Sequence, residues 1–265
     1  MVTKIINRLT RPFIGKERFQ RYFEYLNELS LQGMNIGGGA GTATSGEEIA
    51  LWTIKKLLGS QDKYTLFDVG ANKGDYSLIL NEIFGSNSQI FSFEPSSKTF
   101  ESLEKNTKPF DNIVRYNFGL GDKEEIVTLF SNKEGSGLAS VFNRRLDHFD
   151  IQMDKKEEIQ LNTLDNFCSK NYITNIDLLK LDVEGNEINV LNGARKTIDE
   201  GRIKFIQFEF GGCNIDSRTY FQDFYYLLND RYKISRIVKD GLFELNQYRE
   251  MYEAFTTTNY LASLR

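Results

Sequence analysis

The sequence predicts a doubly wound α/β fold, in which a mostly parallel sheet is covered by helices on both faces. Two observations support this prediction. From residue 63 onward, short runs rich in β-branched and aromatic residues alternate with longer helical patterns. The short runs are also almost continuously apolar, which is typical of parallel strands that are buried on both faces.

The elements of this fold can be placed along the chain. The apolar runs predict strands at residues 65–69, 89–93, 113–117, 178–182 and 204–210. A helix at about 218–229 and strands at 233–238, 242–245 and near 259–263 follow. We expect this last part to close the parallel sheet with an antiparallel hairpin.

A long insertion lies between Gly121 and Tyr172. Extra strands are expected there at 126–130 and 159–161, around a charged loop that contains Arg144, Arg145, His148 and residues 155–158. Loops of this length in a compact domain are commonly functional. We therefore expect the insertion to be part of the functional site.

Residues 1–60 predict a helical extension with a glycine-rich loop, and residues 61–265 the main domain. The extension should be helical to about residue 33, open at a glycine cluster in residues 35–46, and continue as a helix from a capping box at Ser45 and Glu48 to Leu58. Residues 1–21 carry six Lys or Arg against one acid, Glu17, among apolar residues. This basic helix could pack on the main domain, self-associate with a second subunit, or make peripheral contact with an anionic membrane.

Charge and composition exclude several classes of protein. The net charge of -4 argues against nucleic acid as a partner, because phosphate contacts need an excess of Lys and Arg on one face. Cys168 and Cys213 form no CxxC pair, so we expect two buried free thiols. No apolar run is long enough to cross a membrane, and the first residues lack the apolar core of a secretory signal. The cytoplasm is therefore the expected location.

The most informative motif is FDVGANKG (residues 67–74), which leads from a strand into a helix that includes Tyr76. Gly70 would let the backbone approach a ligand, and Asp68 and Asn72 would supply polar groups at the carboxyl edge of the sheet. A dinucleotide-binding GxGxxG motif would need glycine in place of Asn72, and GxxxxGK[ST] has no counterpart. Both pyrophosphate-binding interpretations are thereby weakened.

Two further motifs follow the next strands. Glu94 lies twenty residues after Gly74, at a strand end where a carboxylate can accept hydrogen bonds from both hydroxyls of a ribose. A nucleoside without phosphate fits this pair of motifs. The segment NFGLGD, with Asn117, Gly119 and Asp122, predicts either a groove for a purine or a plain β-turn.

An acidic motif ends the fourth predicted strand. The segment LLKLDVEGNE (residues 178–187) brings Asp182 and Glu184 to the carboxyl edge of the sheet, where ligands gather in such folds. We expect the reactive site here. Glu209, at the end of the fifth strand, and His148, the only histidine, are further candidates.

These segments, in this order, resemble the FkbM family of S-adenosylmethionine-dependent methyltransferases over about residues 67–210. The resemblance implies the seven-stranded, Rossmann-like fold of class I methyltransferases. It also implies methylation of a hydroxyl group, often of a sugar in a surface polysaccharide or glycolipid, or of a related small molecule. By matching positions it implies cofactor contacts from Asp68, Gly70, Asn72, Gly74 and Glu94, and an acidic site motif of Asp182, Glu184 and Glu187. We add Tyr76, Asn117, Gly119, Asp122 and Asp182 to the expected cofactor contacts.

Methyl transfer to an alcohol requires that the acceptor oxygen lies close to the methyl group and loses its proton. Asp182, Glu184, Glu209 and His148 are the candidates for the general base. Alternatively, Asp182, Glu184 and Glu209 could ligate a divalent metal ion that acidifies the hydroxyl.

Two other classes of protein stay open at this point. A nucleoside-binding or scaffold protein could keep the fold without turnover, although the acidic motif is complete. An NAD-dependent oxidoreductase would have to bind its cofactor despite Asn72.

Overall fold

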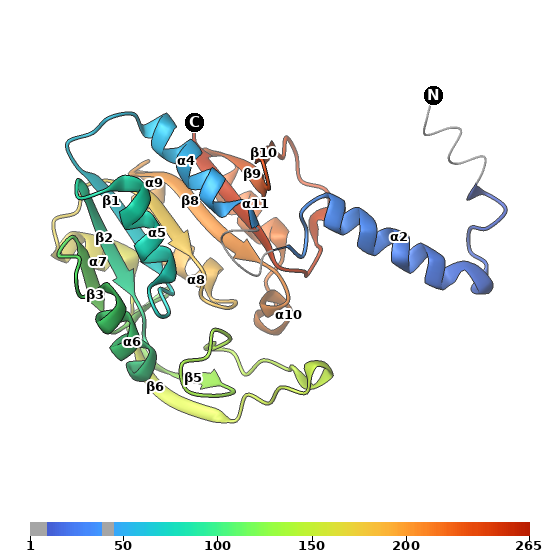
Figure 1. The fold of residues 1–265 in the computed structure, drawn as a ribbon, viewed down its shortest axis with the longest axis horizontal. Coiled ribbons are helices and arrows are strands. Elements are labelled where there is room, and N and C mark those ends of the chain that lie inside the picture. Colours follow the sequence, from blue (N-terminus) through green and yellow to red (C-terminus); the bar gives the residue numbers. More distant parts are fainter. Residues whose placement is uncertain (1–9, 39–44) are drawn as a thin grey trace.

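A mixed sheet of eight strands forms the centre of the molecule (Figure 1). The computed structural model describes residues 10–38 and 45–265. The strands of the sheet are β1 (Tyr64–Val69), β2 (Ser88–Phe93), β3 (Ile113–Tyr116), β7 (Ile176–Leu181), β8 (Ile203–Phe210), β9 (Tyr232–Val238), β10 (Gly241–Glu244) and β11 (Thr258–Leu264). They lie in the order β10-β9-β11-β8-β7-β1-β2-β3.

The strands from β3 to β8 in this order are parallel, and β11, β9 and β10 are antiparallel. The mostly parallel sheet and its antiparallel hairpin are thus confirmed. The sheet has one strand more than the seven that the family resemblance implies, because the predicted strand at 242–245 forms β10 and pairs with β9 at the edge. Strand β11 returns between β8 and β9, so the hairpin forms the edge of the sheet.

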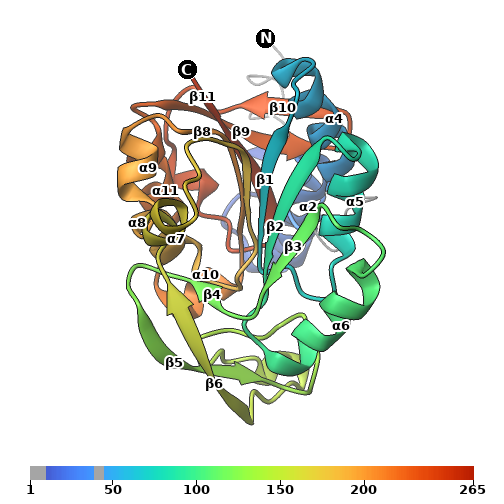
Figure 2. The same cartoon turned by 90° about the vertical axis from the view of Figure 1, so that its left-hand side faces the viewer.

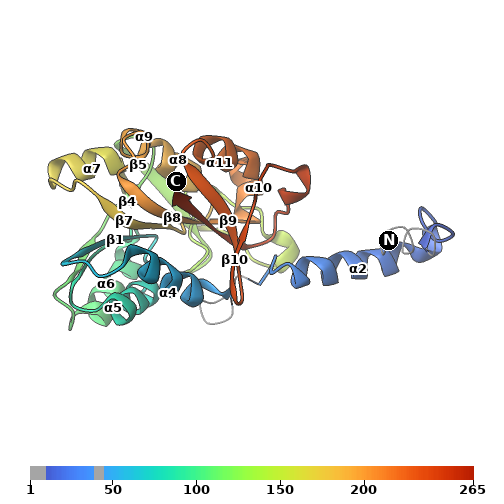
Figure 3. The same cartoon turned by 90° about the horizontal axis from the view of Figure 1, so that it is seen from above.

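Helices cover both faces of the sheet, as Figure 3 shows from above. One face carries α4 (Glu47–Leu58), α5 (Asp75–Phe84) and α6 (Ser97–Thr107); the other carries α7 (Leu164–Lys170), α8 (Glu187–Asn192), α9 (Arg195–Asp199) and α11 (Phe221–Leu228). Each face has its own buried apolar cluster, as a doubly wound fold requires. The short helices α10 (Cys213–Ser217) and η3 (Glu250–Tyr252) lie in connections. Cys168 and Cys213 are buried and free, as predicted.

The chain reverses its direction across the sheet between β1 and β7. From β1 it continues outward through β2 and β3, and it then returns to β7 on the other side of β1. The chain therefore continues to opposite faces of the sheet after β1 (helix α5) and after β7 (helix α8), and the carboxyl ends of two such strands are where these sheets bind ligands (Figure 3).

The insertion forms a second sheet beyond these carboxyl ends (Figure 2). Its strands are β4 (Gly119–Leu120), β5 (Glu125–Ser131) and β6 (Lys155–Asn162), and a short helix η2 (Asp147–Phe149) lies between β5 and β6. Both extra strands are confirmed. Residues 155–158 were expected in the charged loop but belong to β6, because they continue its antiparallel pairing with β5.

The amino-terminal extension departs most from expectation. Residues 11–15 form turns, and the described helical part is η1 (Glu17–Phe19) followed by α2 (Gln20–Gly33). Helix α2 has no buried residue and projects away from the body (Figures 1 and 3). Just after it, Asn35 anchors the chain by donating to the carbonyls of Ser45 and Ile237 at 2.8 and 3.0 Å. The basic segment of residues 1–21 is only partly described, so its three alternatives stay predictions.

Helix α4, by contrast, packs into the body although it lies within residues 1–60. Its Ala50, Leu51 and Ile54 are buried beside the sheet, and it ends at Leu58 as predicted. The predicted capping box is wrong, because Gly46 caps the helix and Ser45 donates to Glu47 at 2.8 Å. Residues 1–9 and residues 39–44 of the glycine cluster lie outside the described residues. No helix within residues 10–38 and 45–265 combines the length and apolar character needed to cross a bilayer.

Candidate active site

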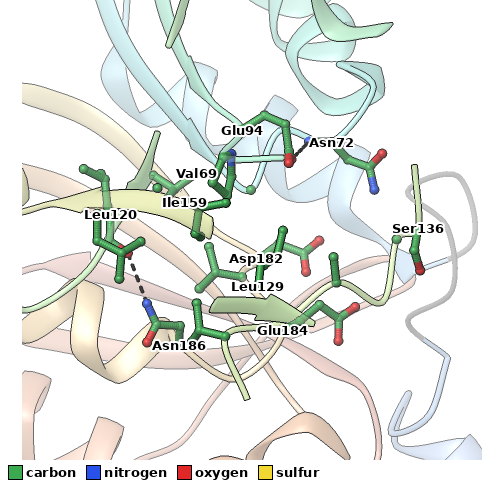
Figure 4. Close-up of a pocket in the computed structure, with 18 residues that line it drawn as sticks. Val69, Asn72, Glu94, Leu120, Leu129, Ser136, Ile159, Asp182, Glu184 and Asn186 are labelled. Atoms are coloured by element: carbon green, nitrogen blue, oxygen red, sulfur yellow. Dashed lines mark hydrogen bonds between the residues drawn. The ribbon is translucent and has the colours of Figure 1, made fainter. Parts of the chain in front are cut away.

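A first cavity lies between the carboxyl edge of the main sheet and the second sheet (Figure 4). The main sheet and its loops contribute Val69, Gly70, Asn72, Glu94, Asp182, Val183 and Asn186. The second sheet contributes apolar side chains, among them Leu120, Leu129, Ile159 and Leu161. The cavity is about 60 Å³ in volume, because residues 136–141 lie across it.

Glu94 is held at the wall of the first cavity by two backbone groups. The nitrogen of Asn72 donates to Oε2 at 3.0 Å, and the nitrogen of Ser96 donates to Oε1 at 2.9 Å. A carboxylate has about four lone-pair sites, so both oxygens can accept further hydrogen bonds. Burial raises the pKa of Glu94 to about 7, although these backbone hydrogen bonds lower it.

Gly70 is required for a reason that the sequence did not reveal. Its φ is +82°, and a Cβ atom at this position would lie 1.8 Å from the backbone oxygen of Asp182. The glycine therefore lets the loops after β1 and β7 touch each other. Gly119 has a similar role, because a Cβ there would lie 2.7 Å from Leu161 of the insertion.

Four of the expected cofactor residues line neither the first cavity nor the two described below: Asp68, Gly74, Asn117 and Asp122. Asp68 is fully buried and accepts from Ser77 at 2.6 Å, on the α5 face of the sheet. Gly74 lets α6 pack closely, since a Cβ would lie 2.8 Å from Leu103. Asn117 donates to the backbone oxygens of Glu94 and Pro95, and Asp122 is exposed. The first three shape the loops around the cavity.

A second cavity, of about 350 Å³, lies on the other side of the β1 loop. Asn72 and Asp182 line both cavities, and the expected cofactor residue Tyr76 lines this one. The wall carries both signs of charge: Glu47, Lys73, Asp75, Lys180, Asp182 and Glu209.

Three buried polar residues beside the second cavity were not among the expected site residues: Glu47, Lys180 and Gln207. Tyr76 donates to Gln207 at 2.8 Å, and Gln207 donates to Glu47 at 2.7 Å. Lys180 lies 2.9 Å from Asp182. A charged residue within the apolar run LLKLD was a signal for Lys180. No local signal existed for Glu47, which is 160 positions from its partner Gln207.

A third cavity, of about 570 Å³, lies between the insertion, α10 and the loop before β11. It is lined by Arg144, His148, Phe149, Glu184, Glu209 and Phe255, among others. Glu184 forms an ion pair with Arg144, whose Nε lies 3.8 Å from Oδ2 of Asp216. Arg144 thereby ties the insertion to the acidic motif, a role that its place in a charged loop did not predict.

Glu209 lies where the second and third cavities meet, because it lines both. Burial, and then the negative charges of Asp182 and Glu184, hold its pKa well above the usual range. His148 is exposed on the outer wall of the third cavity. Three of the four expected general bases, Glu184, Glu209 and His148, thus line one cavity, and Asp182 lines the other two.

Glu187, the last residue of the expected acidic motif, does not line these three cavities. Its fully buried carboxylate accepts from the backbone nitrogens of Val183 at 2.9 Å and Gly185 at 3.1 Å. It therefore holds the loop after β7. In the part of the chain that the structure describes, no three His, Cys, Asp or Glu side chains converge closely enough to hold a metal ion. The ion-assisted route stays a prediction.

Comparisons with known proteins find related sequences. The model of the methyltransferase FkbM domain matches residues 68–234. The 2-O-methyltransferase NoeI of Sinorhizobium fredii is 24% identical over 58% of this chain and 67% of its own. The hexuronic acid methyltransferase AglP of Haloferax volcanii is 24% identical over 64% of this chain and 70% of its own. A crystal structure of an FkbM methyltransferase from Methylobacillus flagellatus superposes with a TM-score of 0.49 and 17% identity over 78% of this chain and 45% of that one.

Proposed function

The chain belongs to the FkbM family of methyltransferases, and on this basis we propose that it methylates a hydroxyl group of a sugar, with S-adenosylmethionine as the methyl donor. One observation carries the assignment of the cofactor site. Glu94 and Asn72 are joined by a hydrogen bond in the wall of one cavity that also contains Asp182. The Glu94 carboxylate, which suits a ribose, therefore lies beside the loop after β1. In this loop Asn72 stands where a dinucleotide-binding motif has glycine.

The residues of the first cavity fit an adenosine. Leu120, Leu129, Ile159 and Leu161 offer an apolar surface to a purine, and Glu94 can accept hydrogen bonds from both ribose hydroxyls. The second cavity suits the amino-acid end of the cofactor, because Asp182 can accept from an ammonium group and Lys73 can attract a carboxylate. The two cavities share Asn72 and Asp182, so one molecule can extend from one into the other.

The third cavity is the proposed acceptor site. The apolar faces of Phe149 and Phe255 can pack against a sugar ring, and the charged groups of Arg144 and Glu184 can bind hydroxyls. When bound, the cofactor supplies an electrophilic methyl group. Glu209 lies between this cavity and the second one, so its ionised carboxylate can take the proton of the acceptor hydroxyl as the general base. Asp182 carries a negative charge beside the expected position of the sulfonium.

The sugar acceptor has support from the relatives. One relative is named for O-methylation and the other for methylation of a hexuronic acid. A hydroxyl in a polysaccharide or glycolipid is therefore the acceptor that we propose. Incubation with isotope-labelled S-adenosylmethionine and a panel of glycans, followed by mass spectrometry, tests this. A gain of one labelled methyl group is expected. Cofactor binding without transfer to any acceptor would favour the binding or scaffold protein instead.

The cofactor itself is tested by thermal shift. S-adenosylmethionine should raise the melting temperature, because a ligand that binds only the folded state stabilises it. NAD should leave it unchanged. A larger shift with NAD would favour the oxidoreductase.

The projecting helix α2 offers a surface for contact with a partner. Tyr22, Tyr25 and Leu29 are exposed on it, and the segment before it is basic. Self-association or contact with an anionic membrane through this helix is our proposal, with the cytoplasm as the compartment. Sedimentation velocity and flotation with anionic vesicles distinguish the two.

A further inference from the structure

Lys180 is one of two charged residues in strand β7, and the other is Asp177 near its start. All six residues of β7 are buried, and the side chain of Lys180 is only 6% exposed. Its ammonium lies 2.9 Å from Oδ2 of Asp182 and 4.8 Å from the centre of the Tyr76 ring. A buried ammonium is stable only where such groups replace its hydration.

Three carboxylates from three elements act on this ammonium: Glu47 from α4, Asp68 from β1 and Asp182 after β7. Their negative charges raise the pKa of Lys180 although burial lowers it, so the ammonium stays protonated. Glu47 and Asp68 are buried, whereas the Asp182 side chain is 37% exposed. Lys180 therefore links two internal charges to the one carboxylate that lines both the first and the second cavity.

This arrangement holds one Asp182 oxygen and leaves the other available. Oδ2 is engaged by Lys180, and within the described residues Oδ1 accepts no hydrogen bond. A carboxylate held at one oxygen loses less rotamer freedom when it binds a ligand through the other, because part of that entropy is already lost.

We propose that Lys180 is a positioning residue for cofactor binding: it fixes Asp182 so that the free carboxylate oxygen meets the amino group of the cofactor. This inference rests on the proposed function. Because Lys180 would act only through Asp182, its effect on cofactor affinity can be measured as an energetic coupling between the two residues.

A double-mutant cycle on the full chain tests the coupling. The dissociation constants of S-adenosylmethionine and of S-adenosylhomocysteine are measured by calorimetry for wild type, Lys180→Met, Asp182→Asn and the double variant. Each single substitution should weaken binding of both ligands by about tenfold, the effect of losing a hydrogen bond to a charged group. The double variant should bind no more weakly than Asp182→Asn alone. Losses that multiply, to about a hundredfold, would overturn the proposal.

Two further variants separate positioning from general loss of structure. Lys180→Arg keeps the charge and should stay within about threefold of wild type; a folded Lys180→Arg variant that loses tenfold would contradict the proposal. Lys204→Met is the matched control, because Lys204 pairs with Asp177 at 2.8 Å outside the three cavities and should leave affinity unchanged.

The proposal can still be tested if a variant does not fold or if the cycle shows no coupling. If Lys180→Met does not fold, the same cycle with Lys180→Gln gives the coupling, and the Lys180→Arg result stands independently. If the cycle fails while wild type binds, only the role of Lys180 is lost. A wild-type chain that binds neither ligand would overturn the proposed function and this inference together.

Discussion

The backbone nitrogen of Asn72 donates a 3.0 Å hydrogen bond to the carboxylate of Glu94, across 22 positions of the sequence. The parallel register of β1 and β2, in which Val69 pairs with Phe93, brings the two following loops together. The same bond holds the carboxylate against the first cavity. Two motifs that are separate in the chain thereby become one binding site.

Glu94→Gln should weaken S-adenosylmethionine binding by about 10- to 100-fold, because a neutral amide accepts more weakly from the ribose hydroxyls than a carboxylate does. Calorimetry measures the effect. Asp68→Asn is the control: Asp68 is buried outside the cavity wall, so this variant should lose thermal stability and keep its affinity within about threefold. Equal losses in both variants would show that the cavity is assigned wrongly.

Cofactor affinity should depend on pH through Glu94. Burial raises the pKa of this carboxyl to about 7 in the free protein, and ribose hydroxyls are best accepted by the ionised form. Binding should therefore release a proton, and affinity should fall by up to about tenfold for each pH unit below 7. Dissociation constants between pH 6 and 8 test this. Glu94→Gln should flatten the profile, and a wild-type profile that is itself flat would exclude Glu94 as the titrating group.

Gly70→Ala should destabilise the fold by about 3 kcal/mol or more, because the new Cβ meets the backbone oxygen of Asp182 and φ is positive. Denaturant unfolding measures the loss. Gly241→Ala is the matched control, since a Cβ there meets nothing within 4 Å. A folded Gly70→Ala protein of normal stability would mean that the loops after β1 and β7 do not touch.

Glu209→Gln should lower kcat by about 100-fold or more if Glu209 is the general base, and leave the cofactor dissociation constant unchanged. His148→Ala provides the comparison, because His148 lines the same acceptor cavity from its exposed outer wall. Its effect should fall mainly on KM for the acceptor. The assignment fails if His148→Ala loses more kcat than Glu209→Gln.

Cofactor binding should displace residues 136–141, a segment that lines the first cavity. The first cavity is about 60 Å³, whereas ligand pockets are typically roughly 300 to 1,000 Å³, so this covering segment has to move outward and then close on the ligand. Hydrogen exchange with and without S-adenosylmethionine measures the change. We expect slower exchange in this segment and no change in the β9–β10 hairpin. Unchanged exchange in both would show that the ligand binds elsewhere.

Much of the fold could be predicted from local pattern. The predicted strands lie within about two residues of the observed ones wherever an apolar run is bounded by polar residues, as at Phe67 and Phe91. Local pattern did not decide how elements pack, as for α2. Its apolar spacing indicated a helix correctly, but spacing does not say what a helix packs against. Residues 155–158 are polar, and only their pairing with β5 makes them a strand.

By itself, the sequence determined the doubly wound sheet, the motifs at its carboxyl edge and the family to which they belong, because each of these depends on residues that are close together in the chain. Only the tertiary structure decided which side chains face a cavity. In the structure Asp68 and Glu187 form internal hydrogen bonds that support the loops and do not line a cavity. Lys180 lies next to Asp182, with Glu47 nearby, and Glu209 lines two cavities. The physical reason is that such contacts join distant segments, and their energies depend on burial and charge that arise only when the sheet and its helices pack together.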